Sequence, residues 1–199
     1  DDDIVGLSTP EPSTSTVRDV QTGAVSADSS VTLIDVVSTT GLNRDGGGFY
    51  VQDAGGGEYS GVYIYAYEEV AAELGDLTAG QVMTLTGTVT EYYDFTEITV
   101  SSASDITITG SSSVTVDNIP SGWSGDWEEW EGCLIEVSDV TVEIEDDGYG
   151  AAELDNGLFL DDDFYDFTVT EGSSYDIKGV VSYAYDEYRI NPRDAGDLD

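Results

Sequence analysis

The sequence predicts an all-β protein built from two tandem β-barrels. Short runs that alternate apolar with polar residues recur along the chain, and turns rich in Gly, Asp and Ser separate them. The second half repeats the strand pattern of the first, which indicates two domains of one kind. Aromatic residues make up 11% of the chain and include 13 Tyr, a content typical of a packed core rather than of a disordered chain.

Residues 1–16 form a polar leader before the first domain. The leader is rich in Ser, Thr and Pro, a composition typical of disorder. Within it, residues 3–7 alternate apolar with polar side chains and carry Ile4, Val5 and Leu7. Such a segment can add as a strand to a sheet edge, on its own subunit or on a neighbouring one. We predict that this extended leader is an assembly element that joins copies of the chain head-to-tail into a homopolymer.

The first domain is expected over residues 17–110. A short helix is predicted at residues 68–74, because two Glu lie in its first turn, where the helix dipole favours them, and Gly75 follows its end. Three strands are expected before this helix and two after it, at residues 30–39, 48–53, 61–65, 81–92 and 96–100. This element order is that of an OB-fold barrel.

The second domain is expected over residues 114–199, after a Ser-rich boundary at 110–113. Residues 87–106 and 179–198 align without a gap and share seven identical residues, which is a strong repeat signal. The place of the helix is taken by an acidic segment, so this domain is expected to lack it. The sequence therefore predicts two tandem OB-fold-like barrels, with a helix in the first alone.

The charge balance limits the partners that the chain can take. It holds 42 acidic and 5 basic residues, a formal net charge of −37. Such a surface repels phosphate backbones and anionic membranes, so nucleic acid is not an expected partner. It attracts divalent cations and stays soluble in high salt. A surface adapted to a saline environment and a surface loaded with calcium both remain open as interpretations.

Cysteine and histidine usage narrows the chemistry further. Cys133 is the single cysteine and opens an apolar run, so we expect a buried thiol and no internal disulfide. The chain has no histidine, which removes the usual member of serine triads and of histidine-ligated zinc sites. No stretch is long and apolar enough to span a membrane. The chain begins at Asp1, which a removed secretion signal or a cloning boundary would explain.

Two acidic runs are candidate calcium ligands. Calcium takes six to eight oxygen ligands, and flexible acidic loops supply them. Neither run has the spacing of an EF-hand, and solvated acidic loops are the alternative interpretation. The candidate ligands are Glu145, Asp146 and Asp147 in one run and Asp161, Asp162 and Asp163 in the other. Two further carboxylates, Asp53 and Asp155, each end a second strand and are expected to form turns.

Evenly spaced tyrosines predict an outward aromatic row on the third strand. The residues are Tyr59, Tyr63, Tyr65 and Tyr67, which share one face of an extended strand. Val62, Ile64 and Ala66 take the other face, towards the barrel interior. The row could stack sugars or bases, contact another subunit, or pack beneath loops. Base stacking is the least favoured of these because of the negative charge.

Three tryptophans precede the first strand of the second domain, at Trp123, Trp127 and Trp130. We expect them to form a hydrophobic plug between the domains. A sugar-binding platform and a contact between subunits are the alternatives.

Several motifs resemble the OB-fold modules that accompany bacterial extracellular nucleases. The resembling segments are GFYVQD, EYSGVYIY, GQVMTLTG and the closing YRINPRD. The likeness covers nearly everything after residue 16, as two modules. It implies an OB scaffold and export, hence an extracellular location. It does not imply nuclease activity, because the separate phosphoesterase domain of those nucleases has no counterpart in this chain.

These observations favour a non-enzymatic protein. Paired carboxylates could suggest a glycosidase, but among 42 acids some pair always lies at a workable separation. We expect a secreted structural protein that self-assembles into a filament or layer, with calcium between acidic surfaces. The alternative is an extracellular binding module for carbohydrate or nucleic acid.

Overall fold

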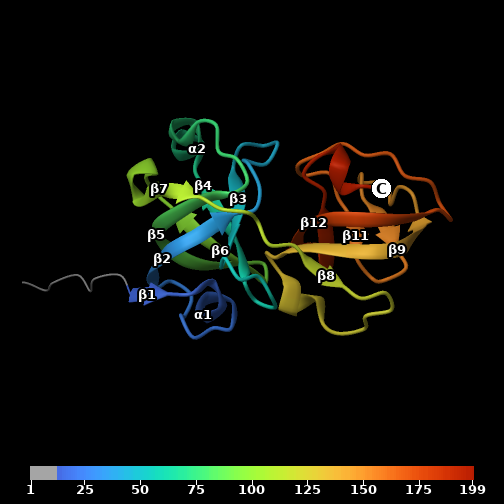
Figure 1. Cartoon of the computed structure of the whole chain (residues 1–199), viewed down its shortest axis with the longest axis horizontal. Coiled ribbons are helices and arrows are strands. Elements are labelled where there is room, and N and C mark those ends of the chain that lie inside the picture. The colour runs from blue at the N-terminus through green and yellow to red at the C-terminus, as the bar shows by residue number, and fades with distance from the viewer. Residues whose placement is uncertain (1–12) are drawn as a thin grey trace, which may run out of the picture.

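The computed structural model describes residues 13–199 and shows two β-barrels side by side (Figure 1). Every strand of the first barrel precedes the linker at residues 112–116, and every strand of the second follows it. The predicted all-β, tandem OB-like architecture is confirmed. No helix among residues 13–199 has the length and apolar character needed to cross a membrane.

The first barrel closes through a circular order of five strands. In chain order its elements are β1 (Ser13–Ser15), α1 (Val17–Gln21), β2 (Ser30–Ser38), β3 (Gly48–Gln52), β4 (Gly61–Ala66), α2 (Glu68–Leu74), β5 (Gln81–Tyr92), β6 (Phe95–Val100), η1 (Ala103–Asp105) and β7 (Ile106–Ser111). The strand order β2-β3-β4-β6-β5 returns to β2, and the β4–β6 pair is parallel. This is the OB-fold topology.

The second barrel has the same topology. Its elements are β8 (Asp117–Ile119), η2 (Trp127–Trp130), β9 (Leu134–Ile144), β10 (Ala152–Leu154), β11 (Phe159–Leu160), β12 (Ser174–Ala184), β13 (Glu187–Asn191) and η3 (Ala195–Asp197). The order β9-β10-β11-β13-β12 returns to β9, with β11 and β13 parallel. As predicted, none of the described residues between β11 and β12 is helical.

Backbone geometry follows the sequence repeat closely. Both residues of the β5–β6 turn, Tyr93 and Asp94, have positive φ, and so do Tyr185 and Asp186 in the β12–β13 turn. Paired positive φ values match the twist of a two-residue hairpin. In addition, β1 lies parallel to β2 and β8 lies parallel to β9, with the same 18-residue offset between the paired residues.

The strands expected in the first barrel agree with the structure to within one residue at each end, and α2 has the predicted bounds. Helix α1 was not predicted. It begins with a capping box, in which Thr16 Oγ1 accepts from the Asp19 N–H at 3.1 Å and Asp19 Oδ2 accepts from the Thr16 N–H at 2.9 Å. Its burial of Val17 and Val20 stabilises so short a helix.

Each barrel has its own apolar core. The inward face predicted for β4 is confirmed, since Val62, Ile64 and Ala66 are at most 1% exposed and lie inside the first barrel. Cys133 is buried, as expected. The residues of the predicted assembly contact, Ile4, Val5 and Leu7, lie outside the described part of the chain. The described end of the leader, β1, pairs with β2 of the same chain.

The two barrels pack directly against each other. At the seam, a Cβ added to Gly61 would lie 2.1 Å from the carbonyl oxygen of Gly132, so the two backbones touch where neither residue has a side chain. An apolar cluster of Tyr50, Phe95, Leu134 and Val180 continues this contact. The close contact fixes the barrels relative to each other and shapes the surfaces beside the seam.

The predicted tryptophan plug between the domains is wrong. Trp127 is buried in the core of the second barrel, and Trp123 and Trp130 pack against that same core. The seam is instead filled by aromatic and aliphatic side chains from the strands of both barrels. The tryptophans follow a strand that belongs to the second barrel alone, which explains their inward packing.

Candidate functional site: an aromatic cleft between the barrels

A cleft of about 870 Å³ lies beside the seam and has one wall from each barrel. The first wall is made by β3, β4, β5 and β6 with the segments that follow β4 and β6. The second wall is made by β12, β13, the turn between them and the segment that follows β11. Strands two and three of an OB barrel, here β3 and β4, form its usual ligand-binding face.

Aromatic rings dominate the lining of the cleft. They are Tyr50, Tyr63, Tyr65, Tyr67, Tyr92, Phe95, Tyr183 and Tyr185. Strand alternation explains how the first wall arises, because residues two apart on β4 and on β5 project to the same side. The row that the sequence predicted on β4 therefore faces a cleft and not open solvent.

The rings form a gradient from the buried seam to the open rim. Tyr50 is 2% exposed and its ring centroid lies 5.0 Å from that of Tyr63, which in turn lies 5.6 Å from that of Phe95. At the rim, Tyr92 is 60% exposed and Tyr185 is 86% exposed. Burial raises the pKa of Tyr50 and of Tyr63, so these phenols keep their protons. A ligand would thus meet fixed rings below and free ring faces above.

Hydroxyl groups of Thr and Ser side chains also line the cleft. They come from Thr88, Thr90, Thr99, Ser101 and Ser182. Thr90 and Thr99 are hydrogen-bonded to each other at 3.1 Å across β5 and β6. Each hydroxyl both donates and accepts, so this wall can bind a polar ligand that carries no charge.

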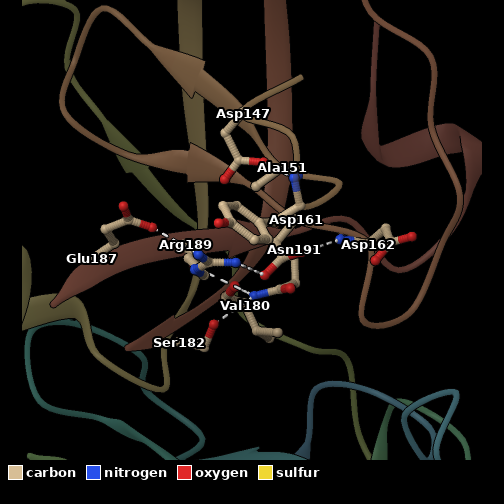
Figure 2. Close-up of polar contacts among 10 residues, drawn as sticks. Asp147, Ala151, Asp161, Asp162, Val180, Ser182, Glu187, Arg189 and Asn191 are labelled. Carbon is tan, nitrogen blue, oxygen red and sulfur yellow. Dashed lines mark hydrogen bonds and ion pairs between the residues drawn. The ribbon is translucent and has the colours of Figure 1, made fainter. Parts of the chain in front are cut away.

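Arg189 is the one basic side chain among residues 13–199 that lines the cleft, and its charge is compensated. Its Nη1 donates to Asp161 Oδ2 at 2.7 Å and its Nη2 donates to Glu187 Oε2 at 2.7 Å. Figure 2 shows the guanidinium held between these two carboxylates. The Arg189 guanidinium also lies 5.2 Å from the ring centroid of Tyr185, a cation–π distance. The residue holds the rim in place and offers no free positive charge.

Two carboxyl groups of the cleft are perturbed by burial. Burial raises the pKa of Glu97, and the nearby Glu91 adds to the shift. Burial together with the charges of Asp161 and Asp162 raises the pKa of Asp163 to about 6. Carboxyl groups of this kind gather at functional sites, and they are poor partners for an anionic ligand.

The structure separates Tyr59 from the predicted row. Tyr59 precedes β4 with a φ of 60°, so it does not continue the strand alternation. Its N–H donates to the carbonyl of Glu129 at 2.7 Å, and the Arg18 guanidinium lies 5.3 Å from the centroid of its ring. Tyr63, Tyr65 and Tyr67 line the cleft, while Tyr59 belongs to the contact between the barrels.

The second wall was missed from the sequence. This wall includes a hairpin that repeats β5–β6 and carries Tyr183, Tyr185 and Arg189. In the alignment of the two repeats, Tyr185 is equivalent to Tyr93 and Arg189 to Glu97. The repeat could have identified the hairpin. Only the docking of the two barrels brings both hairpins to one cleft.

The two acidic runs lie in separate places. In the first run, Asp146 Oδ1 accepts from the Gly148 N–H at 2.7 Å, and Asp147 Oδ1 accepts from the Tyr149 N–H at 2.7 Å. These bonds shape a turn. Glu145 accepts from the Glu171 N–H at 3.3 Å.

In the second run, Asp161 binds Arg189 and Asp162 binds Arg44. Asp163 lines the cleft. Among residues 13–199, no three His, Cys, Asp or Glu are placed to hold a metal ion together. Calcium binding stays a prediction, without a defined site.

Comparisons with known proteins identify no family for this chain. A scan against models of protein families found no match, and a search of curated proteins found none that is significantly similar. The likeness to nuclease-associated modules therefore stays a resemblance of motifs.

Proposed function

We propose that the protein is a non-enzymatic binding protein that holds an uncharged oligosaccharide in the cleft between its barrels. The observation that carries this proposal is the lining of the cleft, which combines tyrosine rings with Thr and Ser hydroxyls. Pyranose rings have an apolar face and a rim of hydroxyls. Tyrosine supplies an apolar ring with a polar tip, and the neighbouring hydroxyls match the sugar's own donors and acceptors.

Charge selects a neutral ligand over an anionic one. The chain carries a net charge of −37, and the positive charge of Arg189 is shared between Asp161 and Glu187. A polyanion such as a nucleic acid or an acidic glycan would be repelled at long range and would find no free cation in the cleft. A neutral oligosaccharide escapes both costs.

Size and rigidity also suit a small ligand. The cleft volume of about 870 Å³ falls within the range of about 300–1,000 Å³ that is usual for such sites. The seam beside it is packed backbone to backbone at Gly61 and Gly132. A wall fixed in this way is preorganised, so binding does not need to order it.

The proposal includes the absence of catalysis. General acid–base work most often uses histidine, and the chain has none. Glu97 and Asp163 leave a glycosidase as the competing hypothesis, because both line the cleft with raised pKa values. Release of reducing ends from any bound oligosaccharide would favour the glycosidase. Export and self-assembly stay predictions from the sequence.

The experiment is a calorimetric titration with a panel of neutral and acidic oligosaccharides. We expect binding of a neutral member, and we expect Tyr65→Ala and Tyr185→Ala each to weaken it about three- to tenfold, the usual worth of one aromatic contact. Tyr149→Ala is the matched control, since this residue is 94% exposed and lies outside the cleft. Binding of acidic members alone, or equal losses in all three variants, would overturn the proposal.

A further inference from the structure

A second, smaller pocket lies at one end of the second barrel, away from the residues that line the cleft. It has a volume of about 260 Å³. Its lining includes two indoles, two carboxylates and two neutral polar side chains, from Trp123, Trp127, Asp139, Asp155, Ser138 and Asn156. The binding function proposed for the cleft makes no use of this pocket.

In the first barrel, helix α1 occupies the position equivalent to this pocket. There, α1 follows β1 directly and closes the end of the barrel with Val17 and Val20, which are 0% and 2% exposed. Asp53, the first residue after β3, accepts hydrogen bonds from the N–H groups of Val17 at 3.2 Å and Arg18 at 3.4 Å. Beyond forming the predicted turn, Asp53 thus binds the N–H groups that begin this helix.

The second barrel keeps the carboxylate and lacks the helix. Asp155 is the first residue after β10, the strand equivalent to β3, and its Oδ1 accepts from the Thr141 N–H at 3.0 Å. Within residues 13–199, no donor reaches Asp155 Oδ2 or either carboxylate oxygen of Asp139. The segment after β8 forms a turn and then η2 in place of an α-helix. Two exposed carboxylates therefore face the pocket of the second barrel, at the position where the first barrel has the N–H donors of α1.

The indoles line the same pocket as these carboxylates. The ring centroids of Trp123 and Trp127 are 4.3 Å apart with a tilt of 51°. Trp127 is 8% exposed, and its Nε1–H donates to the carbonyl of Asn156 at 3.2 Å. The ring of Trp123 is only partly buried and remains at the pocket wall. An indole face next to carboxylates is an environment that attracts an organic cation and excludes an anion.

We propose that this pocket binds a substituted ammonium ion, which lies between the Trp123 indole and the carboxylates of Asp139 and Asp155. The cation takes the electrostatic role that the N-terminal N–H groups of α1 have in the first barrel. The net charge of −37 raises the local concentration of cations. The indole selects a cation with an apolar shell over a hydrated metal ion.

The test compares choline with 3,3-dimethylbutan-1-ol, its neutral isostere, by calorimetry and by the NMR shifts of the indole N–H groups. Ionic strength is held high and constant, so that diffuse attraction to the acidic surface is screened. We expect choline to bind at least tenfold more tightly than the isostere and to shift the Trp123 and Trp127 signals. Equal binding of the two probes, or no choline binding, would contradict the proposal.

Variants locate the site. The double variant Asp139→Asn/Asp155→Asn is expected to weaken choline binding at least tenfold, and Trp123→Leu is expected to weaken it about threefold to tenfold. The control, Asp146→Asn/Asp147→Asn, makes the same charge change in a loop outside the pocket and is expected to leave the affinity within twofold. Equal losses in both double variants would show diffuse attraction only. If the first double variant does not fold, Trp123→Leu and the isostere decide the question.

Discussion

Replacing Glu131 with Gln is expected to stabilise the protein above neutral pH and to change its stability little near pH 5. Glu131 precedes β9 at the seam, where it is 1% exposed. Its Oε1 accepts from the Thr96 N–H of the other barrel at 3.0 Å, and no donor or acceptor among residues 13–199 reaches Oε2. Burial raises its pKa to about 8, nearby Glu128 and Glu91 add to the shift, and the bond from Thr96 opposes it.

The direction of the pH effect follows from proton binding. Between its ordinary pKa of 4.5 and about 8, the folded protein holds a proton on Glu131 that the unfolded chain releases. The favourable contribution of this proton to the free energy of unfolding is therefore complete below about pH 4.5. It is lost progressively as pH rises from there through about 8. The difference between the two pKa values corresponds to about 5 kcal/mol of unfolding free energy. About 1 kcal/mol of this is lost by pH 5 and about 4 kcal/mol by pH 8. Glu131→Gln removes this dependence, which leaves a relative gain of about 3 kcal/mol between the two pH values.

The assay is urea unfolding of both proteins near pH 5 and near pH 8, at one ionic strength. Glu73→Gln is the matched control, because it removes the same charge from an exposed position on α2. The control measures the effect that a smaller net charge has by itself on stability. If the stability difference between Glu131→Gln and the unmodified protein is the same at both pH values, Glu131 is not a buried neutral acid and the reasoning fails.

Three further predictions concern stability. Gly61→Ala is expected to lower the free energy of unfolding by about 1–3 kcal/mol or more, because its Cβ would meet the Gly132 backbone. Gly55→Ala is the control, since a Cβ there would have no atom within 4 Å, and chemical denaturation measures both variants. Thr16→Ala is expected to cost about 1 kcal/mol through loss of the α1 cap, and an unchanged denaturation midpoint would show that the cap does not matter. Raising NaCl from about 0.1 M to about 1 M is expected to raise the melting temperature, because salt screens a net charge of −37; a falling temperature would mean that attractive ion pairs dominate.

The periodicity of apolar residues predicted most of the fold. Alternation along β2 to β6 predicted strand bounds to within a residue, because a barrel strand must present one face to the core. The sequence repeat then supplied the second barrel. Helix α1 was missed because five residues are too few for a helical period, and its one signal was the spacing of Thr16 and Asp19. Strand β1 was missed because Ser13–Ser15 is polar throughout and pairs through its backbone.

The cleft was only half predictable. Even spacing placed Tyr63 and Tyr65 on one face of β4, and the structure agrees. The opposite wall depends on how two barrels dock, which no local pattern encodes. The burial of Glu131 has the same origin, since Glu128 and Glu129 lie in the same acidic segment and are not fully buried. Position at the seam, and not residue type, decides which of the three is buried.

The most direct test of the proposed binding function is an NMR titration of the whole chain with neutral oligosaccharides. Amide signals report where a ligand lies even when it binds weakly. We predict that a binding oligosaccharide shifts signals on both walls at once, in β4, β5 and β6 and in the β12–β13 hairpin. If no neutral oligosaccharide shifts these signals, or if the shifts fall on one barrel away from the cleft, the inter-barrel cleft is not an oligosaccharide site.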